Sequence, residues 1–284
     1  MKREKAGSIV LGVWLAFVLC IKVLAANDVV VAGVCTNEKD ISLYVKGLGE
    51  GIMSVSCQIG TKAGQQVEFE DAAGMENAPK TLIMVDNSLS ITDSNRRKIA
   101  DFLTAFVGKK EEREQIAIAV FDEKIRWLTE FTQAGQELEA AAGSITYQDQ
   151  ETYLTDVLYE VIKKGQLGAE DCYKKIIVIS DGVDNKAIGY TKEELYGQIE
   201  EKAYPIYTLG CVYKNNEEQL KNMFALSRMT GGKDFLLDEA DSMEAVADEI
   251  REDSRAVRFC IIPDAEEMDG SINQVLLTVS CADG

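Results

Sequence analysis

Hydrophobic and polar positions change their period twice along the chain. Residues 28–70 contain short strand-like apolar runs separated by glycines, without a long amphipathic helix. Residues 80–250 alternate short apolar runs with segments whose apolar residues recur at helical spacing. Residues 257–281 return to strand-like patterns around a turn at Asp269-Gly270. The pattern predicts a central α/β region between two β-rich flanks.

The central region predicts a doubly wound, mostly parallel sheet with helices on both faces. Its first apolar run, residues 80–86, is continuous rather than alternating, as expected for a strand covered on both sides. Strands are expected at 80–86, 115–122, 125–131, 175–180, 205–211 and 234–237, and helices at 95–107, 136–145, 153–164, 192–202, 217–229 and 242–250. Because strands alternate with helices of about ten residues, a parallel sheet is the favoured fold class.

The β-rich flanks are too small to be stable separately, since each provides only a few strands. We therefore expect them to form one β-sandwich into which the α/β domain is inserted. Two small β modules, the second completed by residues beyond Gly284, are the alternative. The predicted divisions are 27–79 for the N-terminal β segment with its linker, 80–252 for the α/β domain and 253–284 for the C-terminal β segment.

The N-terminus has the outline of a secretory signal peptide, residues 1–26. A basic start, MKREK, precedes the apolar run 9–20, and small residues follow. The alternative is an uncleaved membrane anchor, but the run is shorter than the roughly 20 residues needed to span a bilayer, and Lys22 interrupts it. In either case the chain is expected outside the cytosol, secreted or at the cell surface.

Composition excludes several function classes. The formal net charge of −18 opposes nucleic-acid binding, and no basic cluster offsets it. The chain has no histidine, which removes Ser-His-Asp and Cys-His catalysis and every metal site that needs imidazole. A metal would therefore be held by oxygen atoms, which suits a hard cation such as Mg²⁺ or Ca²⁺.

The cysteines permit disulfides, because an exported protein matures in an oxidising compartment. We place Cys172 and Cys211 at opposite ends of neighbouring parallel strands, too far apart for a bridge. Pairing is more plausible within the flanks, among the four cysteines at positions 35, 57, 260 and 281.

A cluster of oxygen-bearing side chains follows the first strand of the predicted parallel sheet. The run TLIMVD ends at Asp86, and Ser88 and Ser90 come next at alternate positions. Each could be an ordinary turn residue that satisfies backbone groups. Asp181, however, ends another central strand, and the carboxyl ends of parallel strands meet at one edge of the sheet. We therefore expect Asp86 and Asp181 at the same edge.

The pattern D-x-S-x-S at this position resembles the start of the metal-ion-dependent adhesion site (MIDAS) of von Willebrand factor type A domains. The resemblance implies two further pieces, a threonine before a long helix and an aspartate in an SDG turn. Thr152, in TYLTD, and Asp181, in SDG, match them in the right order, and the similarity covers residues 80–250. Two departures are Leu89 and the pair Gln150-Glu151, which stand where glycines are frequent in the family.

The resemblance implies that Asp86, Ser88, Ser90, Thr152 and Asp181 hold Mg²⁺, with Mn²⁺ or Ca²⁺ as alternatives. A glutamate or aspartate of a protein partner would complete the coordination shell. We thus expect an exported, non-catalytic interaction module of a bacterial surface protein. Nucleic acid is not expected as a partner. Membrane attachment would come only from an N-terminal anchor or from a region beyond Gly284, and the sequence gives no signal for an oligomeric state.

Two other functions are compatible with the same residues. One is a structural scaffold of a cell-envelope assembly with little metal dependence. The other is a metal-dependent hydrolase, for which Glu151 and Asp184 are the candidate general bases. The hydrolase is disfavoured, because aspartate-nucleophile phosphatases place a second acid where this chain has Ser88.

Overall fold

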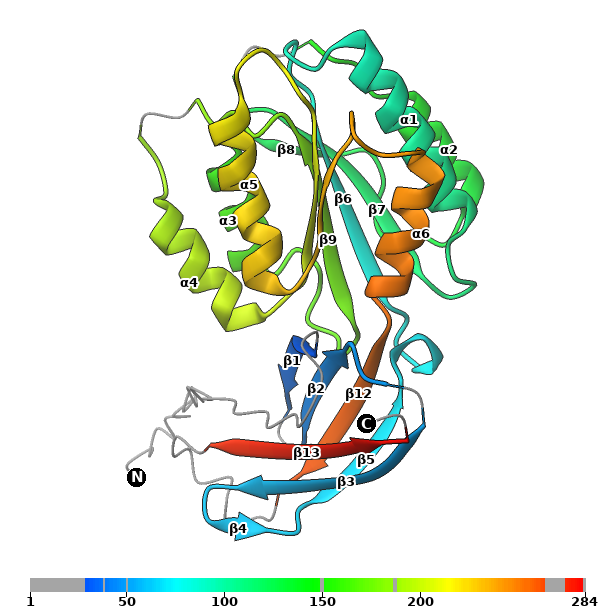
Figure 1. Ribbon diagram of the computed structural model, residues 1–284, viewed down its shortest axis with the longest axis vertical. Helices are drawn as coiled ribbons and strands as arrows, with labels where there is room; N and C mark the ends of the chain where they lie inside the picture. Colours follow the sequence, from blue (N-terminus) through cyan, green and yellow to red (C-terminus); the bar gives the residue numbers. More distant parts are fainter. Residues whose placement is uncertain are drawn as a thin grey trace, which may run out of the picture.

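The computed structural model describes residues 29–37, 39–49, 51–148, 151–185, 188–263 and 274–282, and it places an α/β domain end to end on a β-sandwich (Figure 1). The segment predicted to be a signal peptide, 1–26, lies outside these residues. In the described part of the chain, no helix has the length and apolar character needed to cross a membrane.

The α/β domain is built around a six-stranded sheet with the strand order β11-β10-β9-β6-β7-β8. Neighbouring strands are parallel except β7 and β8, which form an antiparallel hairpin. The strands are β6 (Lys80–Asp86), β7 (Gln115–Phe121), β8 (Ile125–Trp127), β9 (Lys174–Ser180), β10 (Ile206–Gly210) and β11 (Asp234–Leu236). This topology confirms the predicted doubly wound, mostly parallel sheet.

Helices cover both faces of this sheet, as Figure 1 shows. One face carries α1 (Asp93–Gly108), α2 (Gly135–Gly143) and α6 (Met243–Asp253), and the other carries α3 (Leu154–Lys163), α4 (Lys192–Lys202) and α5 (Glu217–Thr230). Successive residues of β6 point to opposite faces, so Ile83 and Val85 pack under the first set of helices and Leu82 and Met84 under the second. All four are fully buried, which explains the continuous apolar run.

The order of the strands reverses between β6 and β9. From β6 the chain crosses through α1 to β7, whereas from β9 it crosses through α4 to β10 on the opposite side. The two connections lie on opposite faces of the sheet, so the loops that leave β6 and β9 diverge. In open α/β sheets such a switch point leaves a crevice at the carboxyl ends of the strands, where sites are built.

The flanks form one sandwich of two sheets. One has the order β1-β2-β12-β5 and the other β13-β3-β4. The strands are β1 (Val30–Thr36), β2 (Ile41–Lys46), β3 (Ile52–Ile59), β4 (Lys62–Ala63), β5 (Gln66–Asp71), β12 (Ala256–Ile262) and β13 (Val275–Cys281); a short 3-10 helix, η1 (Ala72–Gly74), follows β5. Because β12 pairs with β2 and β5, the strands after the α/β domain are interleaved with those before it, and two separate modules are excluded for the described strands.

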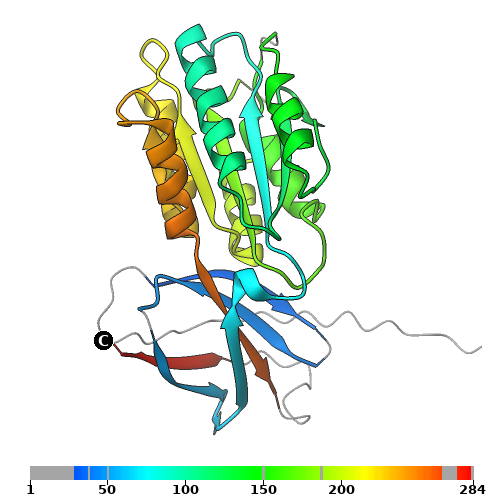
Figure 2. The same ribbon diagram turned by 90° about the vertical axis from the view of Figure 1, so that its right-hand side faces the viewer.

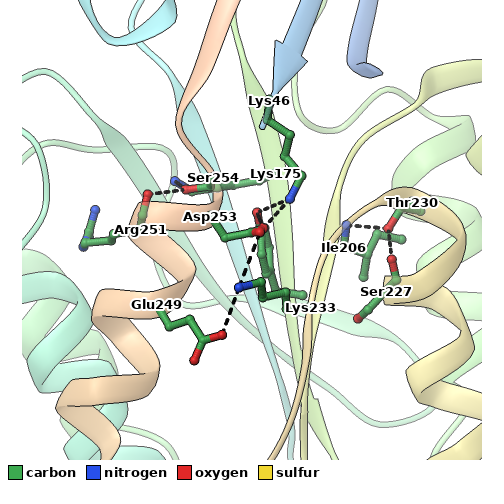
Figure 3. A network of polar contacts seen from close by, with 11 residues as sticks. Lys46, Lys175, Ile206, Ser227, Thr230, Lys233, Glu249, Arg251, Asp253 and Ser254 are labelled. Atoms are coloured by element: carbon green, nitrogen blue, oxygen red, sulfur yellow. Dashed lines mark hydrogen bonds and ion pairs between the residues drawn. The ribbon is translucent and has the colours of Figure 1, made fainter. Parts of the chain in front are cut away.

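The sandwich contacts the α/β domain through the outer face of β2. Leu43 and Val45 of this strand point into the sandwich core, whereas Tyr44 and Lys46 point toward the α/β domain. Lys46 forms an ion pair with Asp253 at the end of α6, in a polar network that Figure 3 shows. Two chain connections also join the units, η1 with β6 and α6 with β12 (Figure 2).

The expected disulfides within the flanks are absent, because the described cysteines are all free thiols. The strand register gives the reason. Cys35 and Cys260 both pair with Ser42 from opposite sides, so they are two strands apart, about 10 Å, which exceeds disulfide reach. In the other sheet Cys57 lies opposite Leu277, several residues along the strand from Cys281. The prediction that Cys172 and Cys211 do not pair is confirmed.

Candidate metal centre

The first part of the site is the turn after β6. Asp86 is completely buried at the end of the strand, and its Oδ1 accepts a hydrogen bond of 2.9 Å from the backbone N–H of Ser88. The hydroxyls of Ser88 and Ser90 are 2.8 Å apart. Alternate side chains of the turn are therefore brought together, as the D-x-S-x-S spacing predicts. Thr92 then caps α1 by accepting a hydrogen bond from the backbone N–H of Asn95.

The second part is the loop before α3. Thr152 is buried, and its hydroxyl donates to Oδ1 of Asp86 over 3.4 Å. The backbone of Thr152 is fixed by Asn185, since the Asn185 side chain accepts from the Thr152 N–H at 3.0 Å and the Asn185 N–H donates to the Thr152 carbonyl at 2.8 Å. Residues 66 positions apart in the sequence thus meet at one carboxylate.

The third part is the turn after β9. Ser180 donates its hydroxyl proton to Oδ2 of Asp86 at 2.6 Å, which links the ends of β6 and β9. Oδ1 of Asp181 accepts from the backbone N–H of Val183 at 3.0 Å, whereas its Oδ2 is buried and has no hydrogen-bond partner. Asn216 holds the turn from outside by donating to the Asp181 carbonyl at 2.8 Å.

Gly182 fixes the shape of this turn. Its φ of +76° lies in the left-handed region that favours glycine. A Cβ at this position would come within 2.8 Å of the backbone of Gln219. Both facts require glycine after Asp181, so the SDG sequence is a backbone requirement as well as a source of side chains.

The two buried carboxylates of the site have no cationic partner. Neither Asp86 nor Asp181 forms an ion pair with any described residue, and both are completely buried. Burial raises the pKa of Asp86 to about 6, although hydrogen bonds from Ser180 and Ser88 oppose the increase and the nearby Asp181 adds to it. The site therefore concentrates negative charge in a region that water does not screen well.

The donor set fits a hard divalent cation. Carboxylate and hydroxyl oxygens are the groups that Mg²⁺ and Ca²⁺ prefer, and the unpartnered Oδ2 of Asp181 is a buried acceptor that an ion would satisfy. In the described residues there is no cluster of three or more acidic, thiol or imidazole side chains suited to a metal, so an ion at this site would need hydroxyl oxygens as further donors. The five predicted residues lie on three neighbouring loops at one sheet edge.

A family model confirms the resemblance to the family, because the von Willebrand factor type A (vWA) domain model matches residues 82–252, more than half of the chain. The chain belongs to this family. The match coincides with the α/β domain, and the sandwich strands lie outside it. A search of curated proteins finds no match.

Solved structures share the vWA fold at low sequence identity. An aerotolerance-related membrane protein from Bacteroides fragilis has a TM-score of 0.51 and 14% identity, with 62% of this chain and 98% of that protein covered. Proximal thread matrix protein 1 from the mussel byssus, with a zinc-occupied MIDAS motif, has a TM-score of 0.53 and 17% identity; 68% of this chain and 49% of that one are covered. At these identities the similarity shows the fold alone.

Two acids near the site are engaged elsewhere. The exposed carboxylate of Glu151 accepts a hydrogen bond from the hydroxyl of Tyr153. Asp184 is exposed, and its Oδ2 accepts a hydrogen bond of 3.0 Å from the backbone N–H of Thr155 at the start of α3. Neither side chain contacts the predicted site residues through a hydrogen bond that the structure describes.

Sequence reasoning missed three supporting residues, Ser180, Asn185 and Asn216. Ser180 was detectable, because it precedes Asp181 and its strand runs beside β6. Asn185 and Asn216 act through contacts between distant loops, for which one sequence gives no pattern.

Proposed function

We propose that the vWA domain is a non-catalytic, extracytoplasmic binding module that holds a divalent cation with Asp86, Ser88, Ser90, Thr152 and Asp181. The ion, Mg²⁺ or alternatively Mn²⁺ or Ca²⁺, would supply a positive charge and a coordination position for an acidic residue of a protein partner. The observation that carries the proposal is the pair of buried carboxylates without a cationic partner, one of which has an unsatisfied oxygen.

The protein's own residues have distinct parts in this function. Ser180 and the Ser88 backbone orient Asp86, and Asn185 positions Thr152. Gly182 allows the turn after Asp181 to pass close to the backbone of α5. A chain of net charge −18 repels acidic groups at long range, so a bound cation would be needed to reverse the local field for an acidic ligand.

A hydrolase is less well supported. It would need a general base beside the ion, and the two acids nearest in sequence, Glu151 and Asp184, bond to Tyr153 and to the α3 backbone instead. A role outside the cytosol is supported by the N-terminal sequence and agrees with fold neighbours described as a membrane protein and a byssus protein.

Calorimetric titration with MgCl₂, MnCl₂ and CaCl₂ tests the metal site. Wild-type protein is expected to show saturable heat with at least one of these ions, and Asp181→Ala to show none. Asp184→Asn is the matched control, because it removes a neighbouring exposed acid that we do not assign to the ion. Absence of heat in the wild type with all three ions would contradict the proposal.

A pull-down from surface extracts, with and without EDTA, tests partner binding. Capture that requires the metal and is lost in Asp181→Ala is expected, whereas capture unaffected by both would favour the structural scaffold.

A further inference from the structure

Three exposed apolar side chains of the α/β domain lie on loops at the same end of the sheet as the candidate metal centre. In the described part of this domain, the large apolar residues that are mostly or substantially exposed are Leu89 (53%), Ile188 (88%), Val212 (38%) and Met229 (46%). The first three lie on loops at the carboxyl ends of the strands, whereas Met229 lies at the end of α5 on the sandwich side. We call Leu89, Ile188 and Val212 the apolar rim.

Each rim residue stands on a loop that is tied to the site. Leu89 lies between Ser88 and Ser90, whose hydroxyls are 2.8 Å apart. Val212 follows β10, and its carbonyl accepts a hydrogen bond of 3.2 Å from the buried side chain of Asn95. These contacts hold the backbone on both sides of the β6 turn.

Ile188 lies on the connection from β9 to α4, between two residues in the sequence that bond to the loop before α3 or to α3 itself. On one side of it, Asn185 is bonded to the backbone of Thr152. On the other, the backbone N–H of Tyr190 donates to Asp156 over 2.9 Å. The apolar rim therefore lies on the loops after β6 and β9, which carry residues of the candidate site, and on the neighbouring loop after β10.

Exposed aliphatic groups are costly to hydrate, and a partner that covers them gains binding free energy in proportion to the area buried. The charge of the site loops acts against a highly acidic partner, because the exposed Glu151 adjoins Thr152 in the sequence and the exposed Asp184 follows Asp181 by three residues. A partner with one carboxylate among apolar side chains would satisfy both conditions.

We infer that this edge recognises a protein surface on which a single Asp or Glu is flanked by aliphatic or aromatic side chains. The inference rests on the proposed function: the cation takes the carboxylate, and the apolar rim takes its neighbours.

Two immobilised pentapeptides provide the test, one with aspartate flanked by leucines and one with aspartate flanked by serines. Full-length protein in MgCl₂ is expected to bind the leucine-flanked peptide at least about tenfold more tightly. The double variant Leu89→Ser, Val212→Ser should lose this preference and still bind Mg²⁺ in the calorimeter. Met229→Ser, which changes an exposed apolar residue at the opposite edge, should keep it.

Equal Mg²⁺-dependent binding of both peptides, or a preference that survives in the double variant, would overturn the inference while leaving the metal site intact. Failure of both peptides to bind would overturn it as well, and the Mg²⁺ heat of the same sample would show whether the proposed metal site fails with it. Asp181→Ala should bind neither peptide.

Discussion

The α/β domain buries acidic side chains at both ends of its parallel strands, which we call the sandwich edge and the far edge of the sheet. The charge of these side chains is balanced by cationic neighbours at one edge and not at the other. At the edge that faces the sandwich, Glu114 is 1% exposed and lies 2.8 Å from Arg251 and 3.4 Å from Lys175. At the far edge, Asp86 and Asp181 are just as buried, but their described partners are uncharged donors. One edge balances its charge internally, and the other does not.

The pKa values express this difference. Burial raises the pKa of Glu114, but Lys175 and Arg251 outweigh it and lower the pKa to about 2. Burial raises the pKa of Asp86 to about 6, and Asp181 adds to the increase. Burial is similar, so the neighbours decide the sign. The sandwich edge therefore neutralises its buried charge within the protein, whereas the far edge leaves its charge unbalanced, as the proposed cation site requires.

The strongest test of the comparison is to neutralise the paired acid. Glu114→Gln keeps the shape of the side chain but leaves Lys175 and Arg251 facing an uncharged group in a buried position. We expect a loss of about 3–5 kcal/mol in the free energy of unfolding, measured by urea denaturation at pH 7. Glu111→Gln, an exposed acid nearby, should change stability by less than about 0.5 kcal/mol. A cost for Glu114→Gln as small as for this control would contradict the assigned pairing.

The loss of stability at low pH should depend on the ion pairs of Glu114 with Lys175 and Arg251. Because the pKa of Glu114 is lower in the folded protein than its ordinary value of 4.5, the unfolded chain takes up the proton first. Its stabilising contribution is complete above about pH 5 and is lost as the pH falls toward 2, by on the order of 3 kcal/mol.

Urea denaturation between pH 2.5 and 7 provides the measurement. Glu114→Gln should flatten the acid limb of the stability curve relative to wild type and to Glu111→Gln. Parallel curves for all three proteins would show that another group controls acid unfolding.

Metal addition should stabilise the protein, and only through the acids of the far edge. At a concentration of 100 times Kd, Mg²⁺ should add about 2.7 kcal/mol and raise Tm by about 5–10 °C. Asp181→Ala should show no rise, whereas Glu111→Gln should show the full rise. If the wild type had the same Tm in MgCl₂ and in EDTA, the proposed binding of a cation at the far edge would be contradicted.

The two edges also differ in how far the sequence predicted them. At the far edge, TLIMVD marks a strand end, and the oxygens of Ser88 and Ser90 are spaced locally, so the pattern was visible. The structure brings Thr152 to Asp86 as expected. Whether these residues bind an ion remains a prediction.

For the sandwich edge, the sequence contains no comparable local pattern. Lys46 and Asp253 are 207 positions apart, and the strand register that unites them follows from the interleaving of β2 and β12. The same register keeps Cys35 and Cys260 apart, so the expected export of the chain was a misleading signal for disulfides. The strand expected at 125–131 ends at Trp127, because Leu128 and Thr129 both donate backbone N–H groups to the Ile118 carbonyl and break the ladder.

The smallest expected change in the free energy of unfolding is that of Asp181→Asn, and its sign distinguishes the two edges. Asp181→Asn makes the same kind of change as Glu114→Gln, from carboxylate to amide, but at the edge without cations. Oδ1 of the new side chain can still accept from Val183, and the repulsion of Asp86 is removed. In EDTA at pH 7 we expect stability unchanged or increased by up to about 1 kcal/mol, by urea denaturation. With MgCl₂ the order should reverse, because only the wild type gains from the ion. A loss of 2 kcal/mol or more in EDTA would mean that Asp181 supports the fold as Glu114 does, and the two edges would no longer differ in kind.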